Sequence, residues 1–132
     1  MSAISDPWNP MPAEIREWAY TADAKFPCED WDLALLWTGF EDLFLEFAGD
    51  DNCPNQQFFL SMLYLMVGDS VRRGVDHHVE FNLKDFIRKA RKYDHEALRV
   101  WSSRSQNLLR NPECFDYEDW CSGRLAEKSG SQ

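Results

Sequence analysis

Apolar residues recur at spacings of three and four over most of the chain, which is the periodicity of an amphipathic α-helix. The clearest example covers residues 29–48, where acidic side chains crowd the first turn and one broad apolar stripe follows. The stripe consists of Leu33, Leu36, Trp37, Phe40, Leu43, Phe44 and Phe47. Gly49 comes next as a candidate helix cap, so the pattern predicts one helix over 29–48 and a loop over 50–54.

Two further helices are predicted in the N-terminal half. Residues 12–25 begin with Pro12, which suits the first turn of a helix, and they stop before Pro27. The segment over 55–73 is apolar on nearly every side, which is typical of the central helix of a bundle. Two arginines at its end carry the charge that a helix C-terminus favours.

The sequence leaves two descriptions open for residues 82–110. The apolar period continues through this segment, so it forms either one long helix or two helices with a break near Asp94, and we favour the break. Asp94 is then the candidate cap of the second helix. Asn111-Pro112 ends the segment in either case, and Asp116 is expected to begin a last short helix.

No strand pattern competes with these helices, because no apolar–polar alternation is sustained and no Asn-Gly or Asp-Gly turn occurs. The sequence therefore predicts an all-α protein, a single compact bundle of five or six helices around a central, nearly all-apolar helix. Residues 1–11 contain Pro7 and Pro10 and are followed by Pro12, so they are expected to form an extended arm that Trp8 holds against the body. The helical domain is expected over 12–127, and 128–132 as a frayed tail.

The composition agrees with one folded domain and narrows the class of function. The 132 residues include 23 acidic and 14 basic side chains, which give a net charge of −9, and 14% of the residues are aromatic. The aromatic content excludes a disordered chain, and the acidity argues against direct binding to nucleic acid or to an anionic membrane. The N-terminus lacks the basic and apolar regions of a signal peptide, so a cytoplasmic protein with reduced cysteines is expected.

The acidic charge is concentrated toward one end of the sequence. Residues 1–60 contain twelve acidic and two basic side chains, whereas residues 61–112 contain six acidic and ten basic ones. One interpretation is that basic residues of the 82–92 segment pair with the acidic helices inside the fold, although exposed pairs contribute little individually. The other is that an acidic surface meets a basic partner, because complementary potentials raise association rates.

The second interpretation assigns a partner-binding surface to eight carboxylates: Glu29, Asp30, Asp32, Glu41, Asp42, Glu46, Asp50 and Asp51. The expected partner is a protein with a basic surface, such as a toxin enzyme that acts on nucleic acid. One exposed tryptophan within an acidic rim would suit such an interface. The tryptophans that the periodicity places least clearly in the core are Trp8, Trp101 and Trp120.

Candidate catalytic and metal-binding groups are sparse. Asp76, His77, His78 and Glu80 lie together and His95 follows, but adjacent histidines point in different directions and rarely bind one metal. No metal-ligand, nucleophile or phosphate-loop motif occurs, so we assign no catalytic residue, no metal site and no cofactor. The four cysteines lack a C-x-x-C spacing and are interpreted as small apolar residues of the core.

A glycine and an acid, Gly68 and Asp69, interrupt the most apolar helix. We interpret Gly68 as a site of close helix packing. We interpret Asp69 as one half of a buried ion pair with Arg72 or Arg73, which follow it three and four residues later. This structural role is favoured over a catalytic one.

Non-enzymatic binding is therefore the leading hypothesis. Its concrete form is a bacterial immunity- or antitoxin-type inhibitor that masks a toxin enzyme through an acidic face. One alternative is a nucleic-acid mimic of the anti-restriction or anti-CRISPR type, which needs carboxylates spaced like phosphates along one exposed face. A second is a small helical enzyme that uses Asp69, His77, His78 or His95, and a third is a structural subunit of a larger assembly.

Overall fold

The chain forms α-helices joined by loops. The computed structural model describes residues 6–29, 31–36, 40–73 and 83–121. The helices within these ranges are α1 (Pro12–Ala19), α2 (Trp31–Leu36), α3 (Glu41–Ala48), α4 (Gln56–Arg73), α5 (Leu83–Arg91), α6 (Glu96–Arg110) and α7 (Tyr117–Cys121), with a 3₁₀ turn over Pro112–Cys114. No residue in the described ranges belongs to a strand, so the predicted all-α class is confirmed.

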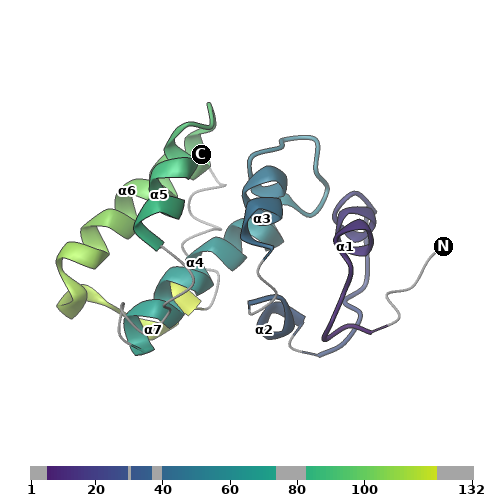
Figure 1. The fold of residues 1–132 in the computed structure, drawn as a ribbon, viewed down its shortest axis with the longest axis horizontal. Coiled ribbons are helices and arrows are strands. Elements are labelled where there is room, and N and C mark those ends of the chain that lie inside the picture. The colour runs from purple at the N-terminus through teal and green to yellow at the C-terminus, as the bar shows by residue number, and fades with distance from the viewer. Residues whose placement is uncertain (1–5, 30, 37–39, 74–82, 122–132) are drawn as a thin grey trace.

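Helix α4 lies at the centre of the bundle (Figure 1). It packs against α2 and α3 on one side and against α6 and α7 on the other, while α1 packs on α3 and α5 packs on α6. Every residue from Met62 to Ser70 is buried. The prediction of a central helix that is apolar on nearly all sides is therefore confirmed, because neighbours cover it on every face.

The single helix predicted over residues 29–48 is wrong, since the structure contains two helices there. α2 ends at Leu36, and Phe40 has the non-helical backbone angles φ −98° and ψ 37° before α3 begins. Glu41 and Asp42 then occupy the first turn of α3, where the helix dipole favours negative charge. Gly39, between the two helices in sequence, has a low helix propensity, which the apolar period alone does not register.

Helix α1 ends at Ala19, earlier than the predicted end near residue 25. Asn55, just before α4, explains the early end. Its side-chain nitrogen lies 2.9–3.0 Å from three carbonyl oxygens, those of Trp18, Ala19 and Thr21. The Cys53 thiol also donates to the Ala19 carbonyl, at 3.2 Å. These contacts from distant residues satisfy carbonyls that a longer helix would have bonded itself.

Replacing Asn55 with alanine is expected to lower the free energy of unfolding by about 1–3 kcal/mol, because part-buried carbonyls at the end of α1 lose their donor. Urea unfolding followed by far-UV circular dichroism measures the change. Asn52→Ala is the matched control, because Asn52 is exposed and its backbone N–H bonds the loop. The control should change stability by no more than about 0.5 kcal/mol. Equal effects of the two substitutions would contradict this role for Asn55.

The break that we favoured near Asp94 is confirmed, because α5 ends at Arg91 and α6 begins at Glu96. Asp94 is not the cap of α6, however. His95 holds that position with an extended backbone, and the Asp94 carboxylate instead accepts a hydrogen bond from Arg99 at 3.0 Å.

Gly49 follows α3 as predicted and forms its cap. Its φ is −91°, so left-handed backbone geometry is not what requires glycine at this position. A Cβ atom there would lie 3.0 Å from the Leu98 side chain and 3.2 Å from the Tyr93 ring. The absent side chain therefore lets Tyr93, in the loop that joins α5 to α6, and Leu98, in the first turn of α6, pack closely on the end of α3.

The N-terminal arm is held to the body, but not by the residue that we predicted. The Trp8 side chain is 60% exposed. The buried Trp31 indole instead donates a hydrogen bond from Nε1 to the Pro7 carbonyl at 3.0 Å, and Pro10 is buried. Trp31 thus binds the arm through its backbone, which leaves the Trp8 ring in solvent.

Trp101 and Trp120, whose position the periodicity did not settle, both lie in the core. Trp120 belongs to α7, and its ring lies 5.4 Å from that of Tyr64 on α4. Asp116 begins this last helix as predicted, because its carboxylate accepts the backbone N–H of Glu118 at 3.0 Å. The predicted continuation of this helix and the tail lie outside the described residues.

Candidate functional site

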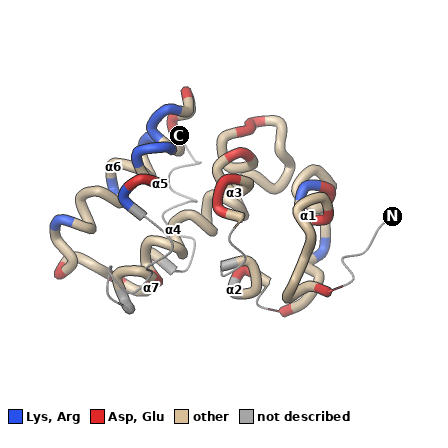
Figure 2. Tube along the Cα trace, viewed as in Figure 1, with Lys and Arg blue, Asp and Glu red and all other residues tan. Residues whose placement is uncertain are grey.

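Seven of the eight carboxylates predicted to bind a partner lie in the part of the chain that the structure describes. Glu29 is exposed just before α2, and Asp32 lies on α2. The other five lie on α3 and in the loop that follows it: Glu41, Asp42, Glu46, Asp50 and Asp51. Figure 2 shows the acidic residues distributed over α1, α2, α3 and the loop after α3. The eighth carboxylate, Asp30, lies outside the described residues.

Two carboxylates of α3 form ion pairs within the chain. Lys89 on α5 donates to Asp42 at 2.7 Å, which is a pair of the kind expected if basic and acidic helices meet inside the fold. Arg16 on α1 pairs with Glu46, and its guanidinium also lies 5.3 Å from the centre of the Phe47 ring. All four charged side chains are substantially exposed, so each pair adds little to stability but fixes where its charges lie.

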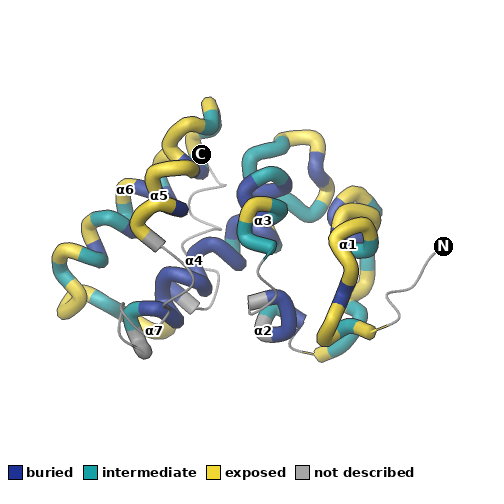
Figure 3. Tube along the Cα trace, viewed as in Figure 1, coloured by how far each residue is buried: buried dark blue, intermediate teal, exposed yellow. Residues whose placement is uncertain are grey.

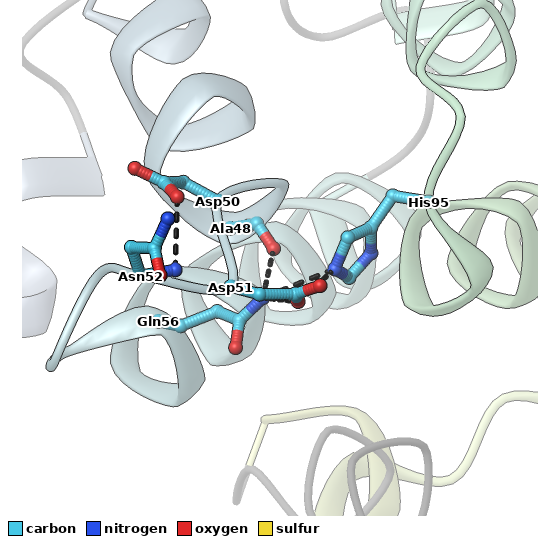
Figure 4. Close-up of polar contacts among 6 residues, drawn as sticks. All are labelled: Ala48, Asp50, Asp51, Asn52, Gln56 and His95. Atoms are coloured by element: carbon cyan, nitrogen blue, oxygen red, sulfur yellow. Dashed lines mark hydrogen bonds and ion pairs between the residues drawn. The ribbon is translucent and has the colours of Figure 1, made fainter.

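The loop after α3 holds its two aspartates in a hydrogen-bonded network (Figure 4). Asp51 Oδ1 lies 2.8 Å from His95 Nε2 and accepts a hydrogen bond from Gln56 Nε2 at 3.0 Å. Gln56 also donates to the Ala48 carbonyl at 3.0 Å. The hydrogen bonds from Gln56 and His95 lower the pKa of Asp51. The network therefore joins the ends of α3, α4 and α6.

This network includes a histidine that is hydrogen-bonded to a carboxylate. In catalytic triads, such a carboxylate orients the histidine that acts as the general base. The other ring nitrogen of His95, Nδ1, is buried and has no hydrogen-bond partner within the described ranges. No described nucleophile is thus within hydrogen-bond reach of it. The Cys53 thiol donates to a backbone carbonyl instead, and burial raises the pKa of that thiol. The contacts therefore support a structural role for His95.

Tyr20 contacts the other aspartate of the loop. Its hydroxyl donates to Asp50 Oδ2 at 2.6 Å, and this hydrogen bond raises the pKa of Tyr20 to about 12. The same bond lowers the pKa of Asp50, as does the backbone N–H of Asn52. Tyr20 thus links the end of α1 to the acidic loop.

The stabilising effect of Tyr20 is expected to depend on pH in a defined direction. The folded protein holds the phenol proton more tightly than the unfolded chain, whose tyrosines titrate near pH 10. The contribution is therefore complete below about pH 10 and is lost as the pH rises toward about 12. We expect phenolate absorbance to include a step near pH 12 that Tyr20→Phe removes. If Tyr20→Phe instead removes a step near pH 10, the pKa of Tyr20 is not raised in the folded protein.

A surface that the sequence did not single out lies at the N-terminal end of the chain. Five large apolar side chains are exposed among the described residues, and four of them fall between residues 8 and 26: Trp8, Met11, Tyr20 and Phe26, with Tyr117 elsewhere. Figure 3 shows that α1 and the arm before it are largely exposed. Exposed acidic side chains accompany them at Asp6, Glu17, Asp23 and Glu29. We call these eight residues, without Tyr117, the N-terminal surface.

An aromatic cluster holds the two segments that carry Trp8 and Phe26. Trp18 Nε1 donates to the Lys25 carbonyl at 2.9 Å, which holds the loop after α1. The next residue, Phe26, stacks on Trp18 with ring centres 5.6 Å apart and remains 60% exposed. The Trp31 ring lies 4.8 Å from that of Trp18, and its indole binds the arm next to Trp8. The two exposed rings are thus presented by one buried framework.

The remaining predicted residues add no cluster. Gly68 and Asp69 are buried in α4, but the side chains of Arg72 and Arg73 lie outside those described, as do His77 and His78. No three His, Cys, Asp or Glu side chains gather into a metal-binding group within the described ranges. In the same ranges, no helix combines the length and the apolar character needed to cross a membrane.

Comparison with known proteins gives no match. No family model matches the chain, and neither do the curated proteins or the solved structures. Function is therefore inferred from the exposure, contacts and charge of the chain's own residues.

Proposed function

We propose that this protein is a non-enzymatic binding protein, an immunity- or antitoxin-type inhibitor that masks a basic toxin enzyme in the cytoplasm of a bacterium. The observation that carries the proposal is the exposure of Trp8 and Phe26 among the carboxylates of the N-terminal surface. Tryptophan is the residue type most enriched among those that dominate binding energy in protein interfaces. Because an aromatic ring has a large apolar area, its burial by a partner contributes a large favourable free energy of binding.

The charge around these rings favours a basic partner. Asp6, Glu17, Asp23 and Glu29 are all exposed, and the sequence from residue 1 to residue 60 has ten more acidic than basic residues. Such a surface attracts a positively charged protein over distances of about 10 Å at moderate salt. Arginine side chains of a partner can bind the N-terminal surface in two ways, because they pair with carboxylates and stack on aromatic rings.

The contacts of α3 and its loop favour this proposal over a nucleic-acid mimic. A mimic needs carboxylates that stand free like phosphates. Asp42, Glu46, Asp50 and Asp51 each bond a side chain of the same protein instead. These contacts support partner binding centred on the N-terminal surface, with the α3 carboxylates adding to the field that attracts the partner.

The proposal is tested by capturing partners with the tagged full chain from a lysate of its source cells. We expect one protein in equal amount, basic at its contact surface, that is retained at low salt and released when the salt concentration rises tenfold. Glu29→Lys should weaken capture. Glu113→Lys, which changes the charge equally at an exposed position outside the N-terminal surface, should leave it unchanged. Retention of no protein, or equal capture by both variants, would overturn the proposal.

A further inference from the structure

A surface pocket lies between α5 and α6. Figure 1 shows these two helices on the other side of α4 from α1. The volume of the pocket is about 300 Å³, at the lower end of the range for small-molecule sites. Six residues line it: Lys84, Ile87, Arg88, Gln106, Leu109 and Arg110. Each helix contributes three of them at spacings of three and four, so one face of each helix forms one wall.

The lining combines positive charge with an apolar floor. Lys84, Arg88 and Arg110 supply three cationic groups and Gln106 supplies an amide, and none of the described residues that line the pocket is acidic. The apolar surface is formed by Ile87 on α5 and Leu109 on α6. This combination matches a ligand that has an anionic group and an apolar body.

The pocket is formed before any ligand binds. Ser102 on α6 donates to the Ile87 carbonyl on α5 at 3.1 Å, which fastens the two helices below the pocket floor. The Phe86 and Trp101 rings pack edge to face, 5.8 Å apart, across the same interface. A ligand therefore meets walls that are already in place, so little binding energy is lost in ordering them.

Two of the three cations form no ion pair with the acidic residues that the structure describes. Arg88 pairs with Asp85 one turn earlier. Lys84 and Arg110 are exposed, and neither forms an ion pair with a residue that the structure describes. The two exposed cations come from different helices, so they can hold an anionic group between them.

We propose that this pocket binds a small organic carboxylate that has an apolar chain, with Lys84 and Arg110 contacting the carboxylate and Ile87 and Leu109 contacting the chain. Charge-assisted hydrogen bonds from the two cations fix the head group, and burial of the chain adds the apolar contribution. The proposal does not rest on the inhibitor function, because the residues involved are separate from the N-terminal surface.

Four probes test this proposal on the isotope-labelled full chain by NMR titration: octanoate, acetate, octanol and octylammonium. We expect octanoate to shift the amide signals of residues that line the pocket. Acetate lacks the apolar chain and octanol lacks the charge, so we expect the affinity of each to be lower than that of octanoate by a factor of about ten or more. Octylammonium, which has the opposite charge, should leave these signals unchanged. Equal binding of octanol and octanoate would overturn the anionic specificity, and no shift with octanoate would overturn the site.

A pair of matched variants separates the pocket from the overall charge. Lys84→Gln with Arg110→Gln should weaken octanoate binding about tenfold or more, because both charge-assisted contacts are lost. Lys25→Gln with Lys92→Gln removes the same charge from exposed positions outside the pocket and should change affinity less than twofold. Urea unfolding confirms that each variant is folded. Equal affinities in the two double variants would overturn the assignment of Lys84 and Arg110.

Discussion

Replacing Trp31 with alanine is expected to lower the free energy of unfolding by about 3–5 kcal/mol. The indole is almost completely buried and packs against two rings that also contact each other, those of Trp18, with ring centres 4.8 Å apart, and Phe58, at 5.8 Å. Its removal leaves a cavity inside the aromatic cluster. The Pro7 carbonyl also loses the donor that holds the arm. One substitution therefore weakens both the core and the attachment of the N-terminus.

Two controls separate these contributions, measured by urea unfolding with far-UV circular dichroism. Trp31→Phe keeps most of the aromatic packing but loses the hydrogen bond to Pro7, so it should cost about 1–2 kcal/mol. Trp8→Ala removes an exposed ring and should change stability by no more than about 0.5 kcal/mol. If Trp31→Ala is tolerated as well as Trp8→Ala, the aromatic cluster does not hold this end of the molecule together.

The second large expected effect is on the affinity for the partner and not on the stability of the fold. Combining Trp8→Ala with Phe26→Ala is expected to weaken partner binding by a factor of about 30 or more, because residues of this kind at the centre of an interface typically contribute 2 kcal/mol or more. Each ring is 60% exposed in the free protein, so their loss leaves the core in place. Isothermal titration calorimetry with the captured protein measures the affinity.

Tyr117→Ala is the matched control for this double substitution. Tyr117 is also a large, exposed aromatic residue, at 55%, but it lies on α7, away from the N-terminal surface. Its removal should leave the affinity unchanged within about a factor of two. If Tyr117→Ala weakens binding as much as the double substitution, the partner does not recognise the N-terminal surface.

Features that depend on neighbouring residues in sequence were predicted well. The apolar residues over 55–73 predict α4 almost to the residue, and the break between α5 and α6 lies near Asp94 as predicted, although His95 and not Asp94 is the cap of α6. Asp116 begins α7 as its type and position suggest. In each case the local pattern and the final packing favour the same structure.

Features that depend on distant residues were missed. The apolar period does not show that Asn55, more than thirty residues away, bonds the last carbonyls of α1. The apolar period also does not show that the stripe over residues 29–48 is divided between two helices, α2 and α3. Exposure of Trp8 depends on Trp31, because a hydrogen bond to the Pro7 carbonyl replaces the ring contact that we predicted for the arm. These outcomes are decided by tertiary contacts, which single-sequence patterns do not contain.

The candidate site was predicted only in part for the same reason. The acidic bias of the N-terminal half is visible in the sequence, and it led to the carboxylates of residues 29–51. The sequence does not show that Asp42 bonds Lys89 or that Asp50 bonds Tyr20. Nor does it show which tryptophan is exposed. The prolines around Trp8 were the available signal, because a residue outside any helix has no helical face to bury.

The inhibitor function is tested most directly by the growth of bacteria that express the captured partner with and without this chain. The partner alone should arrest growth, and co-expression of the wild-type chain should restore it. The variant with Trp8→Ala and Phe26→Ala should restore growth poorly, whereas Tyr117→Ala should restore it fully. A partner that is harmless alone, or an arrest that persists beside the wild-type chain, would contradict the proposed function.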